Sequence, residues 1–142
     1  MGKAILNYTT SVDAARTVAE IQAILVKNGA SRVTVEYEAA RPVGVSFTLG
    51  GRDTYKLPAR PGRVLAVLKG QLNAGKVRPR HATPEQAERV AWRILKDWLE
   101  AQLALIAADQ VELGEVFFAY LFDGRRTAFE AYAEQRKLTG PA

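Results

Sequence analysis

Residues 32–57, RVTVEYEAARPVGVSFTLGGRDTYKL, decide the predicted fold because apolar and polar side chains alternate along much of this stretch. A period of two is the pattern of a half-buried strand, since successive side chains point to opposite faces of a sheet. The alternation predicts strands over 32–38 and 43–49, joined by the connection 39–42. A Gly-Gly turn signal follows, and residues 54–57 then form a short third strand. Three such strands in succession predict an antiparallel meander.

A helix is predicted over residues 10–28, before the strands. Its apolar side chains recur at helical spacing and lie along one stripe. Thr10 with Asp13 resembles a capping box, and Asn28-Gly29 is a typical helix stop. We expect this helix to cover one face of the sheet.

Helical patterns dominate after the strands. A short helix is predicted over 62–70 and a loop over 71–82. Thr83-Pro84-Glu85-Gln86 then combines an N-cap residue, a proline at the first helical position and a capping-box glutamine, so a long helix runs to about residue 109. Further helices are predicted over 111–121 and 127–137.

The predicted class is therefore α+β: an N-terminal helix on a three-stranded antiparallel sheet, followed by a helical C-terminal half with one long helix. Residues 1–142 suit a single domain, with an α-β-β-β-α unit over 10–75 and a helical part over 83–138 packed on it.

The composition excludes several classes of protein. The chain has no cysteine and one histidine, so disulfides, thiolate metal sites and multi-histidine centres are excluded within one chain. No apolar run approaches the ~18 residues of a membrane span, and the N-terminus lacks the apolar stretch of a secretory signal. We expect a cytoplasmic protein that makes no use of the membrane.

Positive charge is concentrated in the first part of the chain. Residues 1–82 hold 13 Lys or Arg and 5 Asp or Glu, whereas residues 83–142 hold 7 and 10, so the two parts carry +8 and −3. Clustered basic side chains neutralise phosphates and release counterions, which supplies most non-specific affinity for nucleic acid. Seven of the eight basic residues between the second strand and the long helix, with the one histidine, are the predicted phosphate contacts: Arg52, Lys56, Arg60, Arg63, Lys76, Arg78, Arg80 and His81.

Single-stranded DNA is the favoured ligand, and double-stranded nucleic acid is the alternative. Residues 76–81 are predicted to clamp the nucleic-acid backbone, because a loop can follow the path of a single-stranded nucleic acid. Tyr55 has two interpretations: it stacks a base beside the arginines, or it alternates with Leu57 and belongs to the core.

Four aromatic residues of the C-terminal half are candidates for a protein interface. Trp92 lies on the more polar side of the long helix and either packs under the sheet or anchors an interface, whereas Trp98 is assigned to the core. The segment 111–121 is apolar nearly all round, so it is buried in the domain or between protomers. The predicted interface residues are Trp92, Phe117, Phe118 and Tyr120, and a homodimer is left open.

No catalytic constellation is predicted. Glu36 and Glu38 share a strand face, and paired carboxylates can bind metal or exchange protons, but Arg32 and Arg41 nearby favour a surface charge pair. The chain has neither a P-loop nor a Gly-x-Ser-x-Gly elbow. We expect no enzyme activity, no cofactor and no metal.

The chain resembles two kinds of known protein. The element order over residues 10–70 resembles the double-stranded RNA-binding domain, whose lysine-rich cluster at the start of the second helix is replaced here by Pro58-Ala59-Arg60-Pro61-Gly62-Arg63. Residues 87–106, AERVAWRILKDWLEAQLALI, and the opening Asn7-Tyr8-Thr9-Thr10 leading to Val18-Ala19-Glu20-Ile21 resemble small proteins encoded by phages and prophages. That resemblance implies a mobile-element origin, a bacterial cytoplasm and no catalytic residues.

Two functional hypotheses follow. The first is a non-enzymatic nucleic-acid-binding protein of phage type that contacts phosphates through its basic central segment. The alternative is a phage-encoded inhibitor or modulator of a host protein, either an anti-defence factor or a transcription regulator, whose basic segment meets an acidic partner surface.

Overall fold

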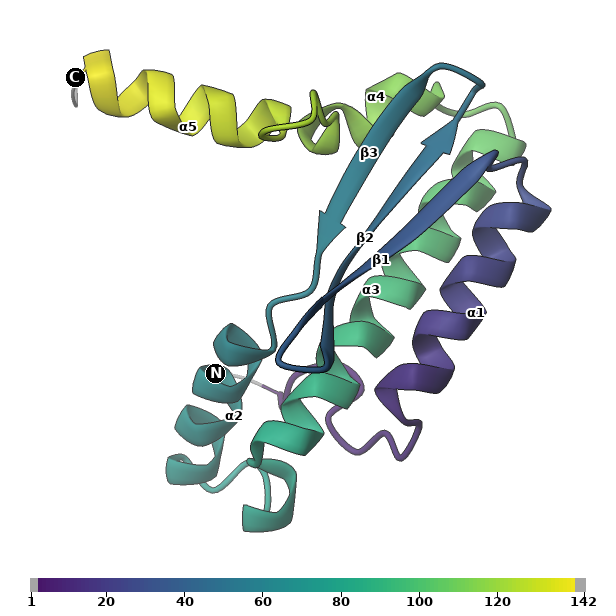
Figure 1. Ribbon diagram of the computed structural model, residues 1–142. Coiled ribbons are helices and arrows are strands. Elements are labelled where there is room, and N and C mark those ends of the chain that lie inside the picture. The colour runs from purple at the N-terminus through teal and green to yellow at the C-terminus, as the bar shows by residue number, and fades with distance from the viewer. Residues whose placement is uncertain (1–2, 140–142) are drawn as a thin grey trace.

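Three strands form one antiparallel sheet in the order β1-β2-β3 in the computed structural model of the protein, which describes residues 3–139 (Figure 1). The strands are β1 (Arg32–Glu38), β2 (Arg41–Leu49) and β3 (Asp53–Pro58). With the helices before and after them, they confirm the predicted α+β class.

The first hairpin is tighter than predicted. Its turn is Ala39-Ala40 alone, and both residues have positive φ, 49° and 66°. A two-residue turn with positive φ at both residues has a backbone twist that matches the twist of the two strands it joins. The strands therefore pair up to the turn, and β2 begins at Arg41 and not at Val43. A bulge then pairs Glu36 with Gly44 and Tyr37 with Pro42.

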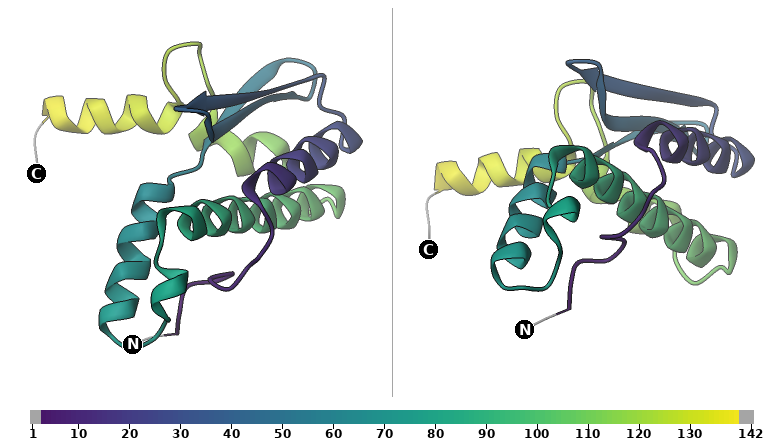
Figure 2. Two further views of the ribbon diagram at one scale, coloured as in Figure 1. Left: turned by 60° about the horizontal axis from the view of Figure 1, so that its bottom comes forward. Right: turned by 90° about the horizontal axis from the view of Figure 1, so that it is seen from below.

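Helices α1 (Ala14–Lys27) and α3 (Pro84–Ala107) pack together on one face of the sheet (Figure 2). The core lies between these layers. Buried residues of the strands pack there against buried residues of the helices: Ala14, Val18, Ile21, Leu25, Val45, Phe47, Leu49, Tyr55, Leu57, Trp92, Leu99 and Leu103. The period of two in the strands is therefore confirmed by the face that they bury.

Helix α1 starts later than predicted. The hydroxyl of Thr10 accepts a hydrogen bond from the backbone N–H of Val12 (3.2 Å), within the turn before the helix. Asp13 occupies the N-cap position without a side-chain cap. The predicted capping box at Thr10 is therefore wrong, because its hydroxyl stabilises the approach to the helix.

The start of α3 is confirmed in part. Thr83 caps the helix, since its Oγ1 accepts from the Gln86 N–H at 3.2 Å. The Gln86 side chain does not return to Thr83. Its Nε2 donates instead to the carbonyl oxygens of Tyr8 and Thr10, each at 2.9 Å, and so fastens the N-terminal segment to α3.

Helix α2 (Pro61–Asn73) is one turn longer than predicted and is followed by the 3₁₀ turn η1 (Pro79–His81). The loop prediction over 71–82 is wrong in these places, because Leu72 packs against a second small core of Leu68, Val77 and Ala87. This contact places the basic segment after α2 against the start of α3.

The helix predicted over 111–121 is the largest error. Helix α4 covers only Leu113–Phe117 and is followed by the 3₁₀ turn η2 (Phe118–Tyr120). The chain turns here because Leu121 forms an antiparallel bridge with Tyr55 of β3, which continuous helix would prevent. Tertiary pairing thus overrides the apolar pattern of this segment.

Helix α5 (Ala128–Thr139) begins where predicted. A reciprocal capping box starts it: Thr127 Oγ1 accepts from the Glu130 N–H at 3.1 Å, and Glu130 Oε1 accepts from the Thr127 N–H at 2.7 Å. The helix projects from the body of the molecule (Figures 1 and 2). None of the helices within residues 3–139 has the length and apolar character needed to cross a membrane.

Ion pairs centred on Glu20 join α1 to α3. Its Oε1 accepts from Arg93 at 2.7 Å and lies 3.9 Å from Lys96 Nζ, and Arg16 contacts Oε2 at 3.3 Å. The hydrogen bond from Arg93 is the main reason that the pKa of Glu20 is lowered from its ordinary value of 4.5.

This network predicts a component of acid unfolding. A lowered folded-state pKa means that the stabilising contribution is present above pH 4.5 and is lost as the pH falls through the folded-state pKa. Glu20→Gln should therefore show a weaker pH dependence of the free energy of unfolding, measured by urea denaturation between about pH 3 and pH 7. An acid dependence equal to that of the unmodified protein would contradict this assignment.

Candidate nucleic-acid interface

The basic residues predicted to form one surface occupy three separate places. Arg52 lies in the turn between β2 and β3, at the top of Figure 1. Lys56, Arg60 and Arg63 line one cavity at the junction of β3 and α2. The remaining three, Lys76, Arg78 and Arg80, follow the C-terminal end of α2. Because α2 has 13 residues, about 20 Å of helix separates its two basic ends. The predicted contacts are therefore distributed over three places, one of which is a cavity.

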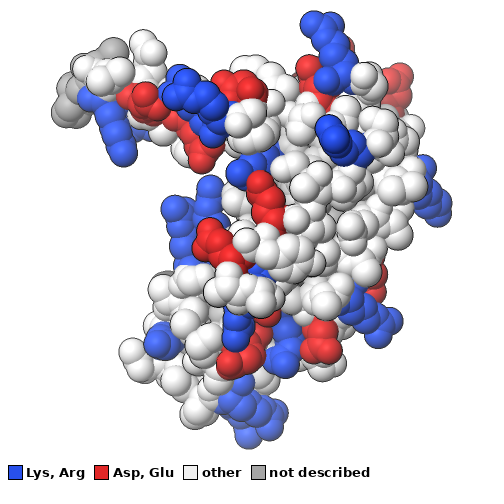
Figure 3. Space-filling view, in the orientation of Figure 1, with Lys and Arg blue, Asp and Glu red and all other residues white. Residues whose placement is uncertain are grey.

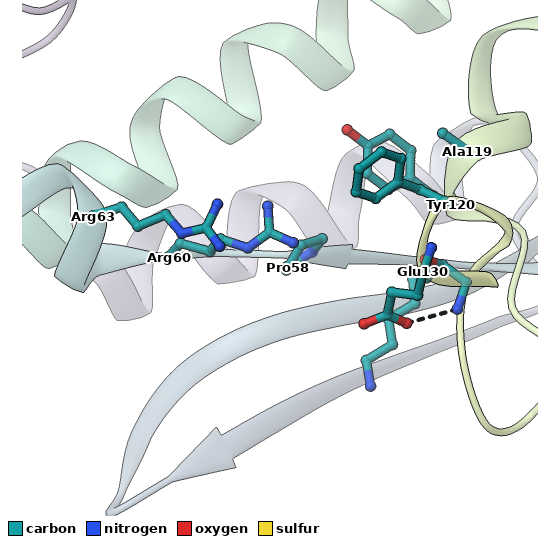
Figure 4. Close-up of a pocket in the computed structure, with 9 residues that line it drawn as sticks. Pro58, Arg60, Arg63, Ala119, Tyr120 and Glu130 are labelled. Atoms are coloured by element: carbon teal, nitrogen blue, oxygen red, sulfur yellow. Dashed lines mark hydrogen bonds between the residues drawn. The ribbon is translucent and has the colours of Figure 1, made fainter. Parts of the chain in front are cut away.

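The cavity at the junction, here called the notch, has a volume of about 360 Å³ (Figure 4). Arg60 and Arg63 enter it from the α2 side, while Tyr120 and Glu130 face them from the C-terminal part of the chain (Figure 4). Segments distant in sequence form its lining: Lys56, Pro58, Arg60, Arg63, Ala119, Tyr120, Thr127, Phe129 and Glu130.

Local sequence explains why the two arginines reach the notch. β3 ends at Pro58, and Pro61 is a favourable first residue for α2, so the chain turns between them. Arg60 is the N-cap residue of α2 and Arg63 lies in the first turn of that helix. Both side chains therefore leave the helix at its positive end, next to the last residues of β3.

The three basic residues of the notch differ in whether their charge is already paired within the chain. Lys56 Nζ lies 3.3 Å from Glu36 Oε2 and 4.9 Å from the centre of the Phe122 ring, so part of its charge is compensated. Within the part of the chain that the structure describes, Arg60 and Arg63 form no ion pair. Basic side chains gather in the hollow between α5 and α2 (Figure 3). The two guanidinium groups are thus free to bind an anion.

Aromatic and apolar side chains border these charges. Phe129, at the start of α5, is 53% exposed, and Tyr120 is half-buried. A second hollow of about 320 Å³ shares Arg60, Arg63 and Tyr120 and continues between α2 and α3. The arrangement offers cations for a phosphate and ring surfaces for a base, which are the two components of single-strand recognition.

The C-terminal wall of the notch is absent from the sequence prediction. Ala119, Thr127, Phe129 and Glu130 are not among the predicted site residues, although the Thr127 capping box correctly marks the start of α5. Nothing local in the sequence indicates that this segment folds back beside β3, since that contact depends on the Tyr55–Leu121 bridge.

His81 is half-buried, and one edge of its ring packs within the chain. Its ring packs edge-on against Tyr8, with centroids 5.4 Å apart, and its Nδ1 is buried without a hydrogen-bond partner among the described residues. The residue lies in η1, and its contact with Tyr8 holds the N-terminal segment against η1.

Three predicted aromatic contacts are interior residues. Tyr55 is buried, and this burial raises the pKa of its phenol, so the base-stacking interpretation of Tyr55 is wrong. Trp92 and Phe117 are fully buried within the chain, which makes them unavailable as interface anchors. Phe118 remains 63% exposed, and Tyr120 lines the notch.

The carboxylates considered for catalysis are surface groups. Glu36 pairs with Lys56, and Glu38 is exposed. Among residues 3–139 no group of three or more His, Asp or Glu side chains is placed to hold a metal ion.

Comparison of the chain with protein-family models, curated proteins and solved structures gives no significant match.

Proposed function

We propose that the protein is a non-enzymatic nucleic-acid-binding protein of phage or prophage type that holds single-stranded DNA at the notch. One observation carries this proposal: two guanidinium groups without ion-pair partners among the described residues line the same cavity as Tyr120 and Phe129. The phosphate would contact Arg60 and Arg63, and the base would stack on an aromatic ring.

The notch favours a single strand over a duplex. Its volume of about 360 Å³ lies at the lower end of the ~300–1,000 Å³ typical of small-molecule sites, and suits one nucleotide unit. The bases of a duplex are stacked on one another, so their faces are not accessible to Phe129 and Tyr120. The backbone of an unpaired strand can place a phosphate and a free base in one cavity.

The basic residues beyond α2 have a secondary part in this proposal. A strand that reached both the notch and Lys76, Arg78 and Arg80 would have to run along about 20 Å of helix. These exposed side chains would then add phosphate contacts without base contacts, which affects affinity but not the identity of the site.

Binding of a labelled oligothymidylate, followed by fluorescence anisotropy at several salt concentrations, tests the proposal. Affinity should fall steeply with salt, because phosphate contacts release counterions. Arg60→Ala/Arg63→Ala should weaken binding at least about tenfold and lower the salt slope by about 1.4, as expected for two lost single-strand contacts.

A matched pair of variants locates the effect. Arg78→Ala/Arg80→Ala removes the same net charge from the other end of α2 and should weaken binding much less. Glu130→Gln keeps an oxygen that can accept from the Thr127 N–H while removing a negative charge from the notch, so it should strengthen binding. Equal losses in the two arginine pairs, or binding insensitive to salt, would refute the notch as the site.

A second candidate function, binding of a host protein, is favoured by α5. This projecting helix exposes Phe129, Tyr132 and Leu138, and Phe118 precedes it. Exposed aromatic residues beside basic ones suit a partner with an acidic rim and an apolar centre. A complex isolated from host lysate that survives nuclease treatment and is lost on Phe129→Ala/Tyr132→Ala would favour this candidate over the first.

A further inference from the structure

The two edges of the sheet differ. β3 has a neighbour on its outer side, since Tyr55 forms an antiparallel bridge with Leu121. On the other side, β1 pairs only with β2 among the described strands. An open edge strand presents unpaired backbone groups and is a template for pairing with another chain. The outer edge of β1 is therefore a surface on which a further strand can pair.

The register identifies which backbone groups face outward. Ala59 N–H donates to the Val43 carbonyl (2.9 Å) on the β3 side of β2, whereas the Thr48 carbonyl accepts from the Ser31 N–H (3.0 Å) on the β1 side. Antiparallel ladders alternate, so within β1 itself the backbone groups of the even-numbered residues Thr34 and Glu36 face β2, and those of the odd-numbered residues from Val33 onward face away.

Three odd-numbered residues therefore form the outward row of β1: Val33, Val35 and Tyr37. The bulge leaves Tyr37 opposite Pro42, which has no N–H to offer. The backbone groups of this row, spaced along the strand, are those that a further antiparallel strand requires.

The sequence of β1, RVTVEYE, is complementary to itself in the antiparallel direction. If two copies pair about Val35, Arg32 of each lies opposite Glu38 of the other, and Val33 lies opposite Tyr37. The two ends thus form opposite-charge pairs, and the two inner positions form branched–aromatic pairs, both of which stabilise a sheet. In a parallel arrangement the like charges would instead lie side by side.

Exposed apolar side chains border the same edge. Tyr37 is 61% exposed, although it lies on the face of β1 that carries Val33 and Val35. Helix α1 lies on the β1 side of the molecule (Figure 1), and its exposed residues include Ala15, Ala19 and Val26, the last exposed by 62%. A second copy paired along β1 would bring its own α1 against these residues.

We propose that two copies of the chain pair antiparallel along β1, centred on Val35, to form a twofold-symmetric dimer with a continuous six-stranded sheet. This surface is distinct from the proposed nucleic-acid site, to which the ion pair between Glu36 of β1 and Lys56 of the notch connects it. The notch lies beyond β3, on the far side of the sheet from β1, so dimerisation leaves both notches open.

Sedimentation equilibrium of the full chain over a range of concentrations tests the dimer. The unmodified protein should approach twice its chain mass of 15.6 kDa. Glu38→Arg places two arginines opposite each other at both ends of the interface, and Arg32→Glu places two glutamates there. Each single variant should raise the dimer dissociation constant at least about tenfold.

The double variant Arg32→Glu/Glu38→Arg supplies the decisive readout. It exchanges the charges but keeps opposite signs across the interface, so dimerisation should return toward that of the unmodified protein. Loss of stability alone would not be rescued in this way. Lys69→Glu reverses the charge of an exposed residue of α2 and should leave the measured mass of the dimer in solution unchanged. A monomeric unmodified protein, or a dimer that neither single variant weakens, would overturn the proposal.

Discussion

Phe117→Ala is expected to lower the free energy of unfolding by about 3–5 kcal/mol, because it empties the centre of an aromatic cluster. The Phe117 ring is fully buried and lies 5.5 Å from the centres of the Phe47 and Tyr55 rings and 5.8 Å from that of Trp98. Truncation therefore removes contacts to both layers at once and leaves a cavity that rigid rings fill poorly.

The neighbouring residue provides the control. Phe118→Ala removes the same side chain from a position that is 63% exposed, and should change the free energy of unfolding by about 0.5 kcal/mol or less. Both variants are measured by urea denaturation, with the m-value checked for constancy. Similar losses for the two would show that α4 does not insert Phe117 into the core.

Trp92→Ala should also cost about 3–5 kcal/mol, because it removes the largest fully buried side chain and its hydrogen bond. The Trp92 Nε1–H donates to the Pro42 carbonyl oxygen at 3.1 Å. This contact joins α3 to the start of β2. Its loss leaves a part-buried backbone acceptor without this donor.

Trp92→Phe separates the two contributions. It keeps an aromatic ring in the cavity but removes the N–H group, so the expected loss is about 1–3 kcal/mol, from the unpaired carbonyl and the smaller ring. Unfolding followed by far-ultraviolet circular dichroism avoids dependence on tryptophan emission. A Phe variant as unstable as the Ala variant would contradict the division between packing and hydrogen bonding.

Local sequence patterns predict the elements whose stability depends on near neighbours. The three strands follow from alternation, and the starts of α3 and α5 follow from Thr83 and Thr127, whose hydroxyls accept from N–H groups three residues on. The same kind of signal at Thr10 misleads, because its hydroxyl bonds within a turn before α1. A capping residue shows that a helix is near, and the exact start depends on which face of the helix reaches the core.

The candidate site is predictable only in part. The basic segment from Arg52 to Arg80 suggests one surface, but a strand turn and about 20 Å of helix distribute its charges over three places. Of the basic residues in this segment, Lys56, Arg60 and Arg63 line one cavity. Charge density along a chain carries no information about direction in space, so the aromatic wall opposite these residues does not follow from it.

The alternation over residues 32–57 and the caps at Thr83 and Thr127 determine the α+β arrangement from sequence alone, because each acts over a few residues of backbone. Contacts between distant segments decide the rest. The Tyr55–Leu121 bridge ends α4 early and brings Tyr120 and Phe129 beside Arg60 and Arg63. Pairing between residues so far apart in the chain depends on the free energy of the whole packed core. Patterns within a few neighbouring residues do not predict that free energy.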